Sequence, residues 1–235
     1  DAVDLRQNAG QLRPRNHGVH HHHVRADAAH GAERALATLP QPLALAGVKL
    51  AAPVGPLAKN IMCVCKNYHD HAQEFARSGV DQSGDKQESP SDPVVFTKAT
   101  SSLADPLQAI SASSDPTHSV DYEGELAVVI AKPCAQLADA DDARPYILGY
   151  TCLNDVTARD LQAKDVQYAR AKGFDTFAPL GPCIETEIDP SALGIRCLVN
   201  GEVKQDGNTR EMAASVYRLV EHISCVMTLF PGDVI

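Results

Sequence analysis

The chain has 235 residues and a formal net charge of −9, and it contains no extended run of lysine and arginine. This charge favours neither a nucleic acid nor an anionic membrane surface as a partner. No window approaches the roughly 18 uninterrupted apolar residues of a membrane-spanning helix, so we expect no membrane insertion. A content of 44% hydrophobic and 22% charged residues is typical of a globular protein with a sizeable core.

The seven cysteines are odd in number and include no pair at the CxxC spacing of structural zinc sites. This usage favours reduced, mostly buried thiols, as in a cytosolic protein. Residues 1–15 carry charges throughout and lack the apolar segment of a secretory signal. Together these features predict a cytoplasmic protein.

Residues 1–58 differ in composition from the rest and are interpreted as a small, divergent N-terminal segment. They hold six of the ten histidines, most of them in the run at 17–23. That run could bind a transition metal, but a solvated loop is the preferred interpretation. A short strand at 48–54 is expected to lead into the main domain, residues 59–235.

In the main domain, short apolar runs between polar residues predict strands at 61–65, 94–98, 126–130, 148–154, 183–186 and 195–199. Asn200-Gly201 after the last of these is a strong hairpin signal. Helices are predicted at 68–76, 140–146 and 215–227. The long polar stretch at 78–93 is typical of a functional loop such as a lid, or of a disordered segment. Strands outnumber helices, which predicts a mainly β fold with peripheral helices, of the α+β class.

Two glutamates at the start of the strand 126–130 are the first candidates for chemistry. If this strand begins a few residues earlier, its period of two places Glu123 and Glu125 on one face. Adjacent carboxylates repel, and both stay ionised only with a cation or several donors between them, a demand that a hard divalent ion satisfies. The alternative is that both glutamates face solvent at a strand edge.

Asp155 follows the apolar strand at 147–153 and would complete a set of three carboxylates. Three oxygen ligands on one side of an ion leave its other positions open to water and substrate, as a catalytic metal requires. The alternative is that Asp155 or Asp160 caps the helix that follows.

His71 and Glu74 stand three residues apart on a predicted helix and therefore share one face. A histidine oriented by a carboxylate is a plausible general base for activating water. Taken alone, such a pair is more often a pair of exposed surface residues.

Lys172, flanked by glycine and aromatic residues, is a further candidate. Such a lysine could be partly buried against an anionic ligand, although a surface position is the default for lysine.

Taken together, residues 59–235 resemble the fumarylacetoacetate hydrolase family, in its single-domain bacterial-type branch. The resemblance rests on blocks in the order of that family: NYHDHAQE at 67–74, VFTK at 95–98, DYEGEL at 121–126, GY at 149–150 with NDVTARDLQ at 154–162, AKGFDT at 171–176, and VNGE at 199–202 with QDGNT at 205–209. Each block alone is weak evidence for the family, but six blocks in the same order are specific for it.

The resemblance implies a mixed β-roll catalytic domain and a homodimer. It also implies roles for individual residues. The divalent metal, Mg²⁺ first and Mn²⁺ or Ca²⁺ as alternatives, would be held by Glu123, Glu125 and Asp155. His71 and Glu74 would activate water, Lys172 would lie near the substrate carboxylate, and Gln162 and, less directly, Arg159 would line the pocket.

One departure concerns the C-terminal end. Chains of the family continue past the equivalent of residues 231–235 into a Thr-Gly-Thr-Pro loop that holds the substrate carboxylate, and this chain stops at Ile235. Since the chain also begins without methionine, we expect a fragment whose catalytic domain is truncated at its C-terminal end.

The resemblance further implies a small 2-oxo or diketo acid substrate from aromatic-compound catabolism, whose carbonyl the metal polarises. The leading hypothesis is hydrolysis of a carbon–carbon bond in an acylpyruvate or fumarylpyruvate. The runner-up is a decarboxylase, isomerase or hydratase acting on a 2-oxo dicarboxylate, and a ureidoglycolate lyase ranks lower. A catalytically inactive binding module with the same fold is the alternative from another class.

Overall fold

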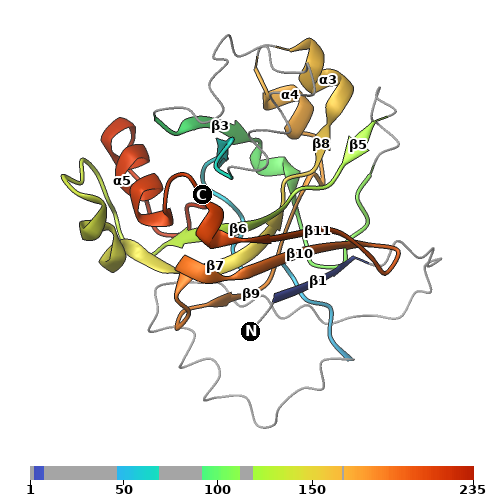
Figure 1. The fold of residues 1–235 in the computed structure, drawn as a ribbon, viewed down its shortest axis with the longest axis horizontal. Helices are drawn as coiled ribbons and strands as arrows, with labels where there is room; N and C mark the ends of the chain where they lie inside the picture. Colours follow the sequence, from blue (N-terminus) through green and yellow to red (C-terminus); the bar gives the residue numbers. More distant parts are fainter. Residues whose placement is uncertain (1–2, 8–46, 69–91, 112–118, 166) are drawn as a thin grey trace.

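The computed structural model describes residues 3–7, 47–68, 92–111, 119–165 and 167–235. The histidine-rich run at 17–23, nearly all of the predicted helix at 68–76 and most of the predicted loop at 78–93 lie outside these ranges. Strands dominate the described part of the chain and a few helices surround them, which confirms the predicted fold class (Figure 1).

The central sheet has four strands in the order β4-β9-β7-β6. Their bounds are β4 Leu103–Ala104, β9 Ala178–Glu185, β7 Ile147–Asn154 and β6 Gly124–Ile130. β6 and β9 each run antiparallel to β7, whereas β4 runs parallel to β9. The predicted strand at 183–186 is thus only the end of a longer strand, and β4 was not predicted.

A second pair of strands, β2 (Ile61–Cys65) and β3 (Val94–Lys98), is antiparallel and has the predicted bounds. Residues 233–235 join this pair to the central sheet. Met62 N donates to Val234 O at 3.0 Å, while Val128 and Ile235 exchange two backbone hydrogen bonds of 2.8 and 3.0 Å. Residues 233–235 therefore lie between β2 and β6, although all three segments are far apart in the sequence.

The third sheet has the order β1-β10-β11, with bounds β1 Val3–Gln7, β10 Gly194–Val199 and β11 Glu202–Asn208. Asn200 and Gly201 both have positive φ, 54° and 82°, as the predicted tight hairpin between β10 and β11 requires. β1 runs parallel to β10, so the N-terminal segment contributes a strand that its composition did not indicate. A small antiparallel pair, β5 (Val120–Asp121) and β8 (Thr157–Ala158), lies close to the ends of β6 and β7.

The α-helices are α3 (Arg159–Lys164), α4 (Ala169–Lys172) and α5 (Val216–Val226). Short 3-10 helices span Thr100–Ser102, Ala140–Tyr146, Pro190–Ala192 and Thr209–Glu211. α5 matches the predicted helix at 215–227, whereas the helix expected at 140–146 is of the 3-10 type. The strand expected at 48–54 is not formed. None of the helices in the described ranges has the length and apolar content needed to cross a bilayer.

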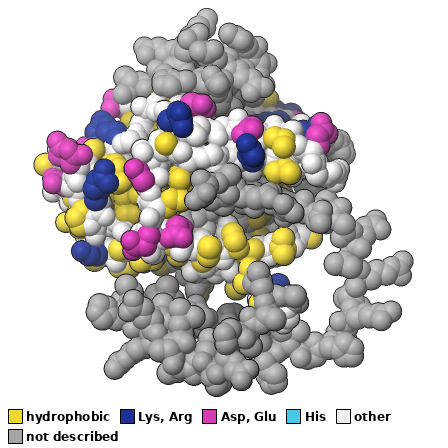
Figure 2. Space-filling view, turned by 60° about the horizontal axis from the view of Figure 1, so that its bottom comes forward, with side chains coloured by type: hydrophobic (Ala, Val, Ile, Leu, Met, Phe, Trp, Pro, Cys, Tyr) yellow, Lys and Arg dark blue, Asp and Glu magenta, His cyan; other side chains and the backbone are white. Residues whose placement is uncertain are grey.

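β6 is buried on both faces and forms the centre of the core. Val128 and Ile130 pack with Val220 and Ile223 of α5, and Ala127 and Val129 pack on the opposite face with residues of β7 and β9. The buried positions of α5 recur every three or four residues, as expected for a helix with one apolar side. On the described part of the surface in Figure 2, lysine, arginine and acidic side chains are interspersed, with no extended area of one charge.

Candidate metal centre

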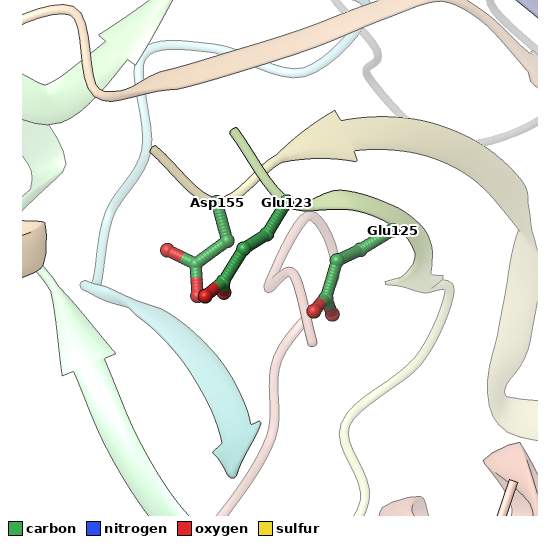
Figure 3. A group of neighbouring side chains, drawn as sticks. All are labelled: Glu123, Glu125 and Asp155. Carbon is green, nitrogen blue, oxygen red and sulfur yellow. The ribbon is translucent and has the colours of Figure 1, made fainter. Parts of the chain in front are cut away.

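The paired ends of β6 and β7 bring three carboxylates together. Glu123 comes just before β6, Glu125 is its second residue, and Asp155 follows the last residue of β7. Gly124 lies opposite Asn154 in the register, and Asp155 N donates to Glu123 O at 2.8 Å. One oxygen from each carboxylate lies within 4.8 Å of the others (Figure 3). Asp155 does not cap α3, whose N-cap residue is Ala158.

Lys172, at the end of α4, bridges two of these carboxylates. Its Nζ lies 2.7 Å from Glu123 Oε2 and 2.6 Å from Asp155 Oδ2, and 5.1 Å from the centre of the Phe96 ring. Burial disfavours the charged form of Lys172, but Glu123 and Asp155 outweigh that effect and raise its pKa. Lys172 is therefore a buried, firmly protonated cation and not the surface residue that lysine usually is.

Lys98, the last residue of β3, holds Asp155 from the other side. Its Nζ donates to Asp155 Oδ1 at 2.6 Å and to Val156 O at 3.2 Å. The side chain is 0% exposed. Asp155 thus has one lysine on each of its two oxygens.

Arg159 holds the second carboxylate oxygen of Glu123, Oε1. Its guanidinium lies 2.6 Å from Glu123 Oε1 and 2.9 Å from Asp121 Oδ2, and it donates to Gln162 Oε1 at 3.0 Å. Although burial opposes its charge, the two carboxylates raise the pKa of Arg159. Two carboxylates and an amide therefore orient this arginine, and it in turn fixes Glu123.

Glu125 differs from the other two carboxylates, because no lysine or arginine of the described ranges forms an ion pair with it. Burial, Asp155 and Glu123 together raise the pKa of Glu125 to about 8. A divalent cation beside the three oxygens would relieve this repulsion, and an all-oxygen donor set suits a hard ion. The residues present therefore fit a divalent metal.

The three carboxylates lie in the wall of a cavity. Other residues in its wall include Gln162, Lys172, Phe96 and the thiol pair Cys63 and Cys65 of β2. The two cysteines share a face, as their alternation predicts. Lys98 and Arg159 do not line this cavity, so in this structure Arg159 contacts the carboxylates from outside the pocket. His71 and Glu74 lie outside the described residues.

Sequence reasoning gave no role to Lys98 or Asp121, although both hold site residues in place. Lys98 ends a strand and has nothing in its neighbourhood to distinguish it from an exposed lysine. Asp121 stands two residues before Glu123, and only the pairing of β5 with β8 brings it next to Arg159. The single available signal was that each stands in a block shared with a known family.

A family model described as the C-terminal part of fumarylacetoacetate (FAA) hydrolase matches residues 60–235. The chain belongs to the fumarylacetoacetate hydrolase family. One relative and two solved structures illustrate the range of activities named within this family. Oxaloacetate tautomerase YisK of Bacillus subtilis is 39% identical over 194 residues, which cover 81% of this chain and 62% of that protein.

Two solved structures are also similar. A 5-carboxymethyl-2-hydroxymuconate delta-isomerase from Mycobacterium smegmatis has 44% identity and a TM-score of 0.67, with 82% of this chain and 69% of that chain covered. A fumarylacetoacetate hydrolase from Exiguobacterium antarcticum has 39% identity and a TM-score of 0.70, with coverages of 85% and 68%. The chain is thus an enzyme of a superfamily whose members include tautomerases, isomerases and hydrolases.

Proposed function

We propose that this family member is a metal-dependent tautomerase or isomerase that interconverts keto and enol forms of a small 2-oxo dicarboxylic acid. The observation that carries the proposal is the three-carboxylate cluster with Lys172 beside it in one cavity wall. The names of the tautomerase and isomerase relatives support the same class of substrate.

We assign Glu123, Glu125 and Asp155 as ligands of a divalent metal, Mg²⁺ first and Mn²⁺ or Ca²⁺ as alternatives. When bound, the ion would supply positive charge to a keto oxygen, which favours enolisation. Arg159 and Lys98 orient Glu123 and Asp155 through their outer oxygens, Oε1 and Oδ1. Lys172 lies on the other two oxygens, Glu123 Oε2 and Asp155 Oδ2, which a bound ion would share with it or take over from it.

Lys172 and Gln162 are proposed to bind the substrate. The ammonium of Lys172 borders the cavity and can attract a substrate carboxylate. Gln162 Oε1 accepts from Arg159, so the amide NH₂ of this buried side chain is left to donate to a substrate oxygen. Without metal, Glu123 and Asp155 raise the pKa of Lys172, which favours its role as a cation that binds a carboxylate.

Keto–enol interconversion also requires a group that moves a proton between carbon and oxygen. We propose His71, oriented by Glu74, for this step, from their spacing in the sequence. A homodimer, a cytoplasmic location and a role in aromatic-compound catabolism likewise remain predictions from the sequence alone.

Hydrolysis of an acylpyruvate is the second candidate, and the same two residues favour it. A histidine paired with a carboxylate can remove a proton from water and direct it at a carbonyl carbon. The Exiguobacterium antarcticum structure, which is named a hydrolase, supports this alternative. Decarboxylation of a 2-oxo dicarboxylate would use the same enolisation without an attacking water.

The test is a substrate panel assayed with and without Mg²⁺ or Mn²⁺. We expect the protein to accelerate the enol-to-keto conversion of oxaloacetate in a metal-dependent way, and His71→Ala to lower that rate by about 10²–10⁴-fold. His222→Ala, on α5 and away from the cavity wall, is the matched control. Cleavage of acylpyruvates without any effect on oxaloacetate would replace the leading proposal with the second one.

A further inference from the structure

Lys98 is the most deeply buried charged side chain of the site, and its position needs a physical reason. A buried ammonium is costly unless it is paired and hydrogen-bonded. Here Asp155 Oδ1 and Val156 O accept from its Nζ, which ties the ammonium to two consecutive residues at the end of β7. Lys98 also lies behind the cavity wall, so a substrate in the cavity does not touch it.

The two lysines on Asp155 differ in their freedom to move. Lys172 lines the cavity and holds Oδ2, whereas Lys98 is enclosed on all sides and holds Oδ1. Figure 3 shows one oxygen of Asp155 beside the Glu123 carboxylate and the other directed away from both glutamates. The oxygen shared through Lys172 with Glu123 is Oδ2. An ion entering from the cavity would therefore share Oδ2 with Lys172 or displace Lys172 from it, while Oδ1 stays with Lys98.

We propose that Lys98 is a positioning residue that makes Asp155 a one-oxygen ligand and thereby favours Mg²⁺ over Ca²⁺. This inference rests on the metal centre of the proposed function. Mg²⁺ requires near-octahedral coordination, at about 2.0–2.1 Å, and usually keeps several waters. Ca²⁺ takes about six to eight oxygens and gains from a carboxylate that binds through both of its oxygens. Lys98 withholds the second oxygen that the larger ion would use.

The experiment is calorimetric titration of the metal-free protein with Mg²⁺ and with Ca²⁺. The compared quantity is the ratio of the two dissociation constants, because general loosening of the fold lowers both affinities alike. Lys98→Met removes the donor at similar length, and Lys98→Gln keeps an N–H donor. Lys59→Met is the matched control, since Lys59 pairs with Asp233 at 2.8 Å and neither residue lines the cavity.

We expect Lys98→Met to reduce the preference for Mg²⁺ over Ca²⁺ by about tenfold, if the loss falls mainly on Mg²⁺, for which changes next to metal ligands typically cost about 10–100-fold in affinity. Lys98→Gln should keep most of the preference, and Lys59→Met all of it. An unchanged ratio in Lys98→Met with intact binding of both ions would overturn the role of Lys98 alone. Failure of the unsubstituted protein to bind either ion would overturn the metal centre as well.

A second measurement covers the case in which Lys98→Met does not fold. Crystals of the unsubstituted protein with Mg²⁺ and with Ca²⁺ should both show Asp155 binding through Oδ2 alone, with Lys98 Nζ still on Oδ1. Asp155 binding either ion through both oxygens would contradict the proposal.

Discussion

The two halves of β6 differ in what surrounds them: one is packed among apolar side chains and the other lies among charged ones. From Leu126 to Ile130 the strand is packed on both faces by apolar side chains, and Val129 and Ile130 are completely buried. Where the strand begins, Glu125 and the preceding Glu123 meet Asp155 among the three cations Lys98, Arg159 and Lys172. The apolar half supplies the free energy that holds the strand in place, while the charged half is fixed in register by its neighbour β7. One strand thus anchors the site and carries it.

The largest effect on stability should come from the apolar half. Ile130→Ala removes buried methyl and methylene groups from the contact with α5, so we expect the free energy of unfolding to fall by about 2–5 kcal/mol. Urea denaturation measures this change. Val203 on β11 has an exposed side chain, so the free energy of unfolding of Val203→Ala should stay within about 0.5 kcal/mol of that of the parent. A variant of Ile130 that keeps full stability would contradict the division between the two halves.

The charged half should respond to substitution mainly through metal binding. Asp155→Asn keeps the side-chain volume but removes the charge, so the melting temperature should no longer rise with Mg²⁺. In the parent protein, a hundredfold excess over the dissociation constant corresponds to about 2.7 kcal/mol of stabilisation. Asp206→Asn, at an exposed pair on β11, should keep the full shift. Persistence of that shift in Asp155→Asn would remove Asp155 from the ligand set.

The pH dependence of the metal-free protein should report on Glu125. Its pKa is about 8 in the folded chain, against 4.5 as the ordinary value. Since a raised folded pKa means that the native state binds the proton more tightly, this group stabilises the fold below pH 4.5. Its contribution is lost as the pH rises to about 8.

Melting temperatures of metal-free parent and Glu125→Gln across this range measure the slope. The variant should show a smaller decrease with pH, and identical slopes in both proteins would argue against the raised pKa.

The smallest effect should come from the link between β11 and the start of β6. Gln205 accepts from Gly124 N at 2.8 Å and donates to Gly124 O at 2.6 Å. Gln205→Ala removes both hydrogen bonds and should lower the free energy of unfolding by about 1–2 kcal/mol. It should also weaken Mg²⁺ binding, because Gly124 lies between two of the carboxylates. A loss of stability with unchanged Mg²⁺ affinity would confine Gln205 to a structural role.

The strands with clear sequence boundaries were predictable, and the short ones were not. β2 and β3 are apolar runs of five residues between polar neighbours, and their predicted bounds match the structure. β4, β5 and β8 have two residues each, too few for any period, and only their partners make them strands. The short helix α4 likewise lacks a side-chain cap that its sequence could have revealed.

The carboxylates of the site could be predicted because their signal is local. The alternation of Glu123 and Glu125 and the position of Asp155 at a strand end are visible in the sequence. The cations could not be placed this way. Lys98, Arg159 and Lys172 come from separate elements, and a lysine or arginine alone is most often exposed. Their burial follows from pairings between residues far apart in the chain.

The join between β2 and β6 has a consequence for the order of folding. On the edge away from β3 and β7, Met62 bonds to Val234 and Val128 bonds to Ile235, so these hydrogen bonds close very long loops. Contacts of such sequence separation are entropically costly and form slowly. On the ribosome, both strands must wait with unpaired edges until residue 235 has emerged. This join therefore forms late in folding, and until it forms the open edges of β2 and β6 are exposed to pairing with other chains.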